Sequence, residues 1–345
     1  MKIIGFDMKH TARDLFVGLL LALCAVQSFA NVEDSYAPES EQVQKVYVTI
    51  GILDIDAINS ADQSFTLNII VQFRWFDPAL AHDGKSSVRK QLTEIEAPRF
   101  LLLNRQRTWS SLLNVVDISP EGEALYRMRL WGDFSQIMRL QEFPFDSHTF
   151  EVPVTAIPHG DGKVQLIPDP EQPSFMGEQF SVADWTIESW TAQSRAISFG
   201  GGKEVQGFVF AFVAERISGH ILIKFIIPLF LIVAMSWVVF WIDPIDGASQ
   251  LSVSVTSVLT LIAYHIALTS KLPDISYLTR MDLFLFGSTL LVFSSLIEVV
   301  LTSRLAKVGR IKLAQRMDAI CRIAFPMAYA FIGYLALIAG VGAAM

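Results

Sequence analysis

The first half of the chain is dominated by alternating apolar and polar positions. From Phe65 to Trp75 the odd positions are all apolar and the even positions are polar with one exception. This period of two predicts a β-strand that buries one face only. Shorter alternating runs recur around Met128 and Phe210, with turn sequences rich in Gly, Pro and Asp between them. We therefore expect residues 31–215 to form an all-β, immunoglobulin-like extracellular sandwich.

The second half of the chain contains four long apolar stretches. They cover about 219–242, 247–270, 277–301 and 319–343. Each is long enough to cross a hydrocarbon core of about 30 Å as a helix. Residues 216–345 are therefore predicted to form an all-α transmembrane bundle of four helices.

Basic residues mark the segment between the third and fourth stretches. They are Arg304, Lys307, Arg310, Lys312 and Arg316, in a predicted loop of about 15 residues. Because positive charge favours the cytoplasmic side, we expect this loop in the cytoplasm. An even number of spans then places the sandwich and the C-terminus together on the periplasmic or extracellular side.

The N-terminus has the pattern of an export signal. Basic residues precede an apolar run from Leu15 to Val26, and Ser28-Phe29-Ala30 fits a cleavage site. We expect residues 1–30 to be a signal peptide; a lipoprotein signal through Cys24 is the weaker alternative, because Leu23 precedes it. Cleavage would leave Cys321 as the one cysteine, so neither an intrachain disulfide nor a cysteine zinc site is expected.

The second apolar stretch carries a regular stripe. Its members are Ser252, Thr256, Leu259, Ala263, Ile266 and Ser270. Steps of three and four residues put them on one helix face. A stripe that is polar at its start and apolar in its middle suits a helix lining a gated water pathway. The alternative is that the hydroxyl residues let transmembrane helices pack closely.

The composition supports a membrane protein with an acidic external domain. Hydrophobic residues make up 52% of the chain and the mean hydropathy is +0.42. Residues 31–215 carry a net charge of −12, whereas residues 216–345 carry +4. An acidic surface disfavours nucleic acid and enriches small cations nearby.

No enzyme motif is recognisable in the chain. The histidines lack metal-ligand spacing, and no nucleophile elbow or phosphate-binding loop occurs. We expect no catalytic residue, no metal and no cofactor. Glu298 is unusual because an intramembrane carboxylate either pairs or faces water. A membrane-anchored periplasmic sensor without ion conduction remains the alternative function.

Several short motifs carry a family resemblance. Phe143-Pro144-Phe145-Asp146, Trp75-Phe76-Asp77, Arg216 before the first span and Leu272-Pro273 after the second occur in a specific order. The chain thereby resembles the bacterial pentameric ligand-gated ion channels of the Cys-loop receptor superfamily. The cysteines that name the superfamily would fall at Gln136 and Phe150, so the Cys pair is missing.

The resemblance implies a homopentamer in the bacterial inner membrane, surrounded by lipids and conducting monovalent ions. The stripe would line the pore, with Leu259, Ala263 and Ile266 as its hydrophobic gate. Asp243 and Asp246 near the inner mouth favour cations. A small-molecule agonist or protons would open the channel.

The resemblance also implies where signals enter and how they reach the pore. The predicted coupling residues are Phe143, Pro144, Phe145, Asp146, Arg216, Lys271 and Pro273. The predicted ligand-binding residues are Phe199, Phe208, Ile157 and Ile70, near a hairpin from 199 to 208. Since two of these four are isoleucines, we expect a partly apolar ligand or a pH signal instead of an acetylcholine-like cation.

Overall fold

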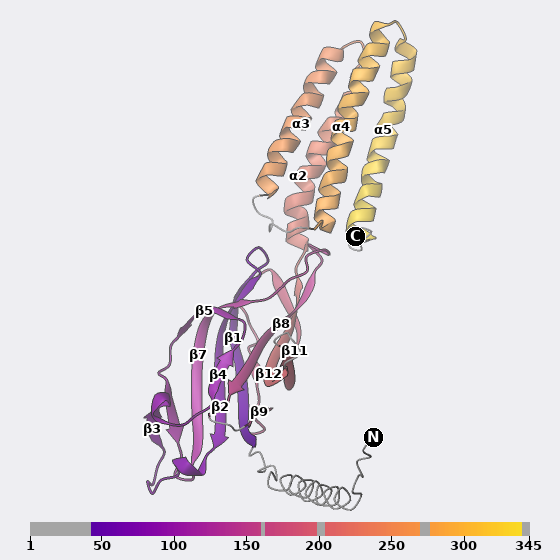
Figure 1. The fold of residues 1–345 in the computed structure, drawn as a ribbon. Coiled ribbons are helices and arrows are strands. Elements are labelled where there is room, and N and C mark those ends of the chain that lie inside the picture. Colours follow the sequence, from indigo (N-terminus) through magenta and orange to yellow (C-terminus); the bar gives the residue numbers. More distant parts are fainter. Residues whose placement is uncertain (1–42, 160–162, 199–203, 270–276, 340–345) are drawn as a thin grey trace, which may run out of the picture.

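The computed structural model describes residues 43–159, 163–198, 204–269 and 277–339. Within these ranges a β-sandwich is followed by a bundle of four long helices, as Figure 1 shows. The predicted fold class is confirmed. The predicted signal peptide lies outside the described residues, as do Phe199, Ser270, Lys271 and Pro273.

The sandwich consists of two sheets. Its strands are β1 (Val43–Asn59), β2 (Ser64–Phe76), β3 (Val88–Gln91), β4 (Arg99–Leu102), β5 (Arg105–Ser110), β6 (Val115–Ile118), β7 (Glu123–Ser135), β8 (Ser147–Ile157), β9 (Lys163–Pro168), β10 (Phe175–Met176), β11 (Trp185–Ser198) and β12 (Glu204–Arg216). Among the described residues, the larger sheet runs β10-β1-β2-β7-β6-β3, with β5 beside β7 and β9 beside β1. The smaller sheet runs β11-β12-β8-β4.

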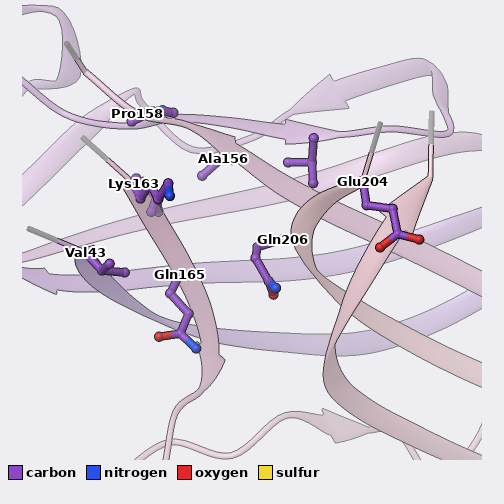
Figure 2. A pocket seen from close by; sticks show the side chains of 9 residues that line it. Val43, Ala156, Pro158, Lys163, Gln165, Glu204 and Gln206 are labelled. Carbon is purple, nitrogen blue, oxygen red and sulfur yellow. The ribbon is translucent and has the colours of Figure 1, made fainter. Parts of the chain in front are cut away.

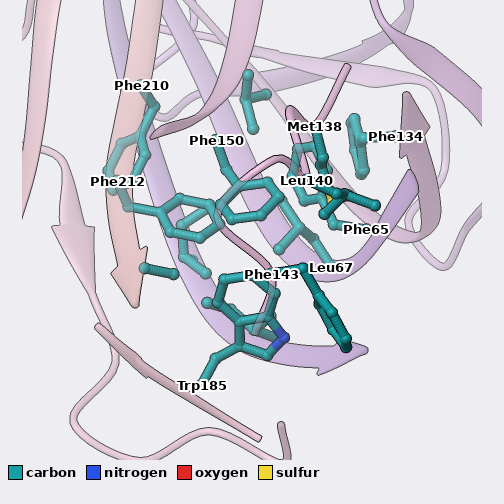
Figure 3. Packing of buried hydrophobic residues seen from close by; sticks show 14 of the residues in the cluster. Phe65, Leu67, Phe134, Met138, Leu140, Phe143, Phe150, Trp185, Phe210 and Phe212 are labelled. Atoms are coloured by element: carbon teal, nitrogen blue, oxygen red, sulfur yellow. The ribbon is translucent and has the colours of Figure 1, made fainter. Parts of the chain in front are cut away.

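The alternation along β2 has the predicted consequence. Phe65, Leu67, Ile69, Val71 and Phe73 are fully buried, and Trp75 is 1% exposed. They face aromatic side chains of the smaller sheet: the Phe65 and Phe150 ring centroids lie 5.1 Å apart, and those of Phe150 and Phe212 lie 5.2 Å apart. Figure 3 shows this core. The aromatic rings of the two sheets thus pack directly against each other in the core.

The bundle consists of α2 (Gly219–Val238), α3 (Gly247–Thr269), α4 (Arg280–Lys307) and α5 (Ile311–Gly333). Helical turns extend α2 to Trp241 and α5 to Ile338, and all four helices are long and apolar enough to span a membrane. The central helix is α4, which contacts the other three. It begins at a capping box in which Thr279 accepts a hydrogen bond from the Asp282 amide and donates its own amide to the Asp282 carboxylate.

The predicted length of the basic loop between the last two helices, about 15 residues, is wrong. The first of them ends at Lys307 and the next begins at Ile311, so only three residues connect them. Gly309 has a φ of +84°, which permits this tight reversal. Arg304 and Lys307 lie in the last turn of α4. Their positive charges stabilise the negative end of the helix dipole, and so the helix continues into a polar sequence that resembles a loop.

Candidate pore and gating site

The predicted pore stripe lies on the outward face of α3. Ser252, Thr256 and Ala263 are exposed, Leu259 is 61% exposed and Ile266 is 69% exposed. In a single subunit this face therefore has no protein neighbour. Flanking positions such as Val255 and Ile262 are also half-exposed, so the uncovered surface is wider than the stripe. Such a surface is available both to a central pathway and to neighbouring copies.

The opposite face of α3 packs inside the bundle. Gln250, Ser254 and Ser257 are fully buried, and Leu261 is 2% exposed. Gln250 donates to the backbone carbonyls of Val239 at 3.2 Å and Ile242 at 3.0 Å. These bonds fix the rotation of α3 against the end of α2. Ser254 and Ser257 therefore support helix packing, and only the outward hydroxyls fit the water-pathway interpretation.

The hydroxyl group of Thr256 has a fixed direction. It donates to the Ser252 carbonyl at 2.8 Å, and Thr260 donates to the Thr256 carbonyl at 2.8 Å. This satisfies the donor within the helix and leaves the oxygen lone pairs on the exposed face. On the outer face of α3 near Thr256, the threonine oxygen can therefore accept a hydrogen bond from water.

Asp243 and Asp246 lie between α2 and α3. Both are exposed. The Asp243 carboxylate accepts from the Ile245 amide at 3.1 Å, and Asp246 accepts from the Ser249 amide at 3.3 Å. Hydrogen bonds from Ser249 lower the pKa of Asp246. Both carboxylates thus lie just before the start of α3.

A buried ion pair lies at the end of the sandwich from which the chain enters the first transmembrane helix. Arg216, at the end of β12, donates from Nε to Asp146 Oδ1 at 2.7 Å and from Nη2 to Asp146 Oδ2 at 2.9 Å. The side chains are 9% and 1% exposed, respectively. Arg216 Nη2 also donates to Ser60 Oγ at 2.7 Å. Asp146 and Arg216 are both among the coupling residues that the resemblance implies, and the structure pairs them.

Aromatic rings and a histidine complete this ion-pair cluster. The guanidinium carbon of Arg216 lies 4.2 Å from the Trp185 ring centroid and 5.1 Å from that of Phe143. The His148 Nε2 lies 2.8 Å from Asp146 Oδ2. Burial alone would raise the pKa of Asp146, but hydrogen bonds from His148 and Arg216 hold that pKa at about 2. The carboxyl group is therefore ionised at neutral pH.

A second contact joins the same loop to α4. Glu142 forms an ion pair with Arg280, whose guanidinium carbon lies 5.9 Å from the Phe145 ring centroid. The Arg280 amide donates to the Gln141 carbonyl at 3.1 Å. Just before α4, at three residues before Arg280, the Tyr277 hydroxyl accepts a hydrogen bond from the Leu140 amide at 2.9 Å. The loop from Leu140 to Asp146 is thus fastened to α4 as well as to the end of β12.

The sequence prediction missed Arg280 and Glu142 as coupling residues. A basic residue at the start of a span is expected as an interfacial anchor, and nothing in its spacing points to a partner almost 140 positions earlier. Pro144 is buried and Phe145 is 36% exposed, within the same loop. The remaining predicted coupling residues, Lys271 and Pro273, lie outside the described residues.

The predicted ligand-binding residues do not form one cluster within the subunit. Phe208 is fully buried in the sandwich core, because it lies on the inward face of β12. Its side chain does not reach the surface in this structure, and its part in a ligand site stays a prediction. Ile157 is 50% exposed at the end of β8, whereas Ile70 lies on the larger sheet, facing away from the core. Only a second subunit could bring such faces together.

A cavity lies beside the start of β12. Its volume is about 480 Å³, and its walls come from β1, β8, β9 and β12. Figure 2 shows Lys163, Gln165, Glu204 and Gln206 around it, together with apolar side chains. No group of three or more possible metal ligands occurs among the described residues. The chemistry of this cavity is that of a mixed polar and apolar pocket.

Two family models match the chain. Residues 27–207 match the neurotransmitter-gated ion-channel ligand binding domain, and residues 225–310 match the neurotransmitter-gated ion-channel transmembrane region. Together they span the sandwich and the first three transmembrane helices.

Curated relatives agree with the family models. The human gamma-aminobutyric acid receptor subunit rho-3 is 23% identical over 82% of this chain and 65% of its own length. The human subunit rho-2 is 24% identical over 80% of this chain and 62% of its own length. A gamma-aminobutyric acid receptor subunit beta of Caenorhabditis elegans is 25% identical over 72% of this chain and 46% of its own length. The chain thus spans just under two thirds of the length of the two human subunits. With the sandwich, the four helices and both models in agreement, the chain belongs to the neurotransmitter-gated ion-channel family.

Proposed function

We propose that the protein is a homopentameric ligand-gated ion channel of a bacterial inner membrane. The observation that carries the proposal is the uncovered stripe on α3, which is polar at Ser252 and Thr256 and apolar at Leu259, Ala263 and Ile266. One helix cannot enclose water, so several copies are needed, and family membership supplies the number five. From Ser252 to Ile266 the stripe would extend about 21 Å along the pore at 1.5 Å per residue.

The apolar part of the stripe would act as the gate. Five copies of Leu259, Ala263 and Ile266 would form rings that lose water when narrow, which stops ions without a plug. The hydrated part would begin at Ser252 and Thr256, whose exposed oxygens can face a water column.

Cations are the proposed permeant ions. Asp243 and Asp246 are exposed at the predicted cytoplasmic end of α3, and the external domain is acidic. Rings of carboxylates attract cations. The measurement is the reversal potential under a salt gradient: a potential that follows the potassium gradient supports the proposal, and one that follows chloride refutes it.

The ligand would be a small organic molecule that binds between subunits near the β11–β12 hairpin. The relatives' names identify gamma-aminobutyric acid receptors, and the nearby cavity offers both Lys163 and Glu204. A small zwitterion or carboxylate with an apolar stem matches this mixture. Protons are the second candidate stimulus, because the His148 and Asp146 pair lies at the coupling junction.

The sandwich would control the gate through the two contacts made by the loop from Leu140 to Asp146. One fastens it to Arg216 before α2 and the other to Arg280 at the start of α4. A bistable interface of this kind is what coupling over a long distance requires.

Ion flux with purified protein in liposomes tests the function directly. A panel of small amines, carboxylates and pH jumps is applied, and flux is compared between wild type and Leu259→Ser. Flux that is stimulated by a panel member, and raised in the variant without a stimulus, supports a gated pore lined by this stripe. If no condition produces flux in either protein although ligand binding is measurable, the protein is the sensor without conduction. Native mass measurement in mild detergent must also show a pentamer.

A further inference from the structure

Two carboxyl groups are buried against each other inside the helix bundle. Glu298 on α4 is 6% exposed and Asp318 on α5 is 1% exposed. Glu298 lies nine residues before the end of α4 and Asp318 lies seven residues after the start of α5, so the short connection brings the two buried side chains to a similar level of the packed, antiparallel helix pair. They lie toward the predicted cytoplasmic end, away from the sandwich and from the loop that contacts Arg216.

The pair also lies where α5 is most deeply enclosed by its neighbours. Ala314 and Asp318 are the buried residues of the described α5 helix. Most of the described helix faces outward, away from the other three helices. An acidic side chain therefore occupies one of the few positions where the outermost helix is enclosed by its neighbours.

Neither carboxyl group receives a hydrogen bond from another side chain or from the backbone among the described residues. All four carboxyl oxygens are buried and lack a donor. The cation that acts on Asp318 is Arg322, one helical turn later; it donates to the Phe240 carbonyl at 2.9 Å, and its guanidinium carbon lies 5.5 Å from the Trp241 ring centroid. It acts on the pair through its charge but does not donate to it.

A further acidic residue and a thiol lie near the pair. Cys321, one turn after Asp318, is an uncharged neighbour of both carboxyl groups. Asp243, between α2 and α3, adds a further negative charge near Asp318. The positive charge of Arg322 therefore acts on Asp318 together with the negative groups Glu298 and Asp243.

Two ionised carboxylates in contact within such a site are strongly unfavourable, because both lose hydration and they repel each other. A single proton removes one charge and supplies the missing donor, since a carboxylic acid can donate to a carboxylate. The remaining charge can interact with Arg322. We propose that Glu298 and Asp318 form a proton-binding site that holds one shared proton at neutral pH and fastens α5 to α4.

Infrared spectroscopy of the full-length protein in lipid tests this proposal. At pH 7 the wild type is expected to show a carbonyl stretch of a protonated carboxylic acid, shifted by exchange into D₂O. The double variant with Glu298→Gln and Asp318→Asn should lose this band, whereas Glu215→Gln, which removes an exposed carboxylate, should keep it. A spectrum without the band in wild type refutes the proposal, as does a band that survives in the folded double variant.

Thermal unfolding provides a second, independent measurement. Raising the pH above neutrality should lower the melting temperature of wild type, since removal of the shared proton leaves two facing carboxylates. In Glu298→Gln the amide can donate to Asp318 at any pH, so this loss should disappear. Wild-type stability that follows sodium or potassium concentration at fixed pH, without a protonated band, would mean that a metal cation occupies the site and would overturn the proposal. Because the wild-type band requires no substitution, a variant that fails to fold does not remove the test.

Discussion

The Asp146–Arg216 ion pair gives a quantitative test of how the sandwich is joined to the membrane domain. In Asp146→Asn the amide cannot replace both charge-assisted bonds at 2.7 and 2.9 Å, and Arg216 keeps its charge in a site where its side chain is 9% exposed. Removing one partner of a buried pair costs about 3–5 kcal/mol, because the other charge is left uncompensated. We expect a loss of that size in the stability of the sandwich.

The pKa of Asp146 gives a smaller, independent figure. Its folded value of about 2 lies below the ordinary 3.8. A displacement of this size corresponds to roughly 2 kcal/mol at neutral pH. Since the pKa of Asp146 is lower in the folded protein, its contribution to the free energy of unfolding is complete when the pH is above the ordinary pKa of 3.8. This contribution is lost as the pH falls toward 2. The difference between wild type and Asp146→Asn should therefore narrow in that acidic window.

Arg195 and Glu151 provide a matched control. They form the same two-point contact, at 3.0 and 2.6 Å, but their side chains are 47% and 30% exposed. Glu151→Gln should cost about 1 kcal/mol or less, because solvent screens an exposed pair. The assay is thermal unfolding of the purified protein followed by tryptophan fluorescence. At about 2–4 °C per kcal/mol for a domain of this size, Asp146→Asn should lower the midpoint by at least ~6 °C. Equal shifts in the two variants would refute the argument from burial.

Three further predictions follow from single contacts. Leu259→Ser should raise liposome flux without stimulus about tenfold, if the apolar ring loses ~1.4 kcal/mol of closed-state stability; Ile323→Ser, on the exposed face of α5, should not, and equal leakage would place the gate elsewhere. Arg280→Gln should shift the concentration of stimulus at half-maximal flux by about 2- to 30-fold, the range of coupling energies for one contact; an unchanged midpoint would remove Arg280 from the coupling route. Gly122→Ala should lower the unfolding midpoint more than Gly309→Ala: both have positive φ, but a Cβ at 122 would lie 2.5 Å from a backbone oxygen and one at 309 meets nothing within 4 Å. Equal midpoints would show that the backbone around 122 adjusts freely.

Local periodicity determined the architecture of this protein. The alternation from Phe65 to Trp75 identified both the strand and its buried face, because successive side chains of a strand point to opposite sides. Apolar length identified four spans, and helical spacing placed Leu259 and Ile266 on one outward face of α3. These properties depend on neighbours within a few positions, so the sequence alone determines them.

The limits of periodicity appear where charge and burial compete. The basic residues after Leu301 suggested a loop, yet α4 continues to Lys307, since an exposed helix end tolerates and even favours cations. Phe208 was expected at a ligand site, but its position on β12 turns it inward. The alternation around Phe210 already places Phe208 and Phe210 on the same buried face, because side chains two positions apart in a strand point to the same side. The expected ligand role came from the family resemblance and not from this pattern.

The pairings between distant residues were decided by the tertiary structure. Asp146 could be matched to Arg216 by family resemblance, but the stacking on Trp185 and the contact between Glu142 and Arg280 could not. Likewise Glu298 was identifiable as an unusual intramembrane acid, while its partner on α5 was not. The residues next to a charged side chain in the sequence do not identify the distant residue with which it pairs. Its energy depends on which groups the packed helices and sheets bring within a few ångströms, and on how much water they exclude.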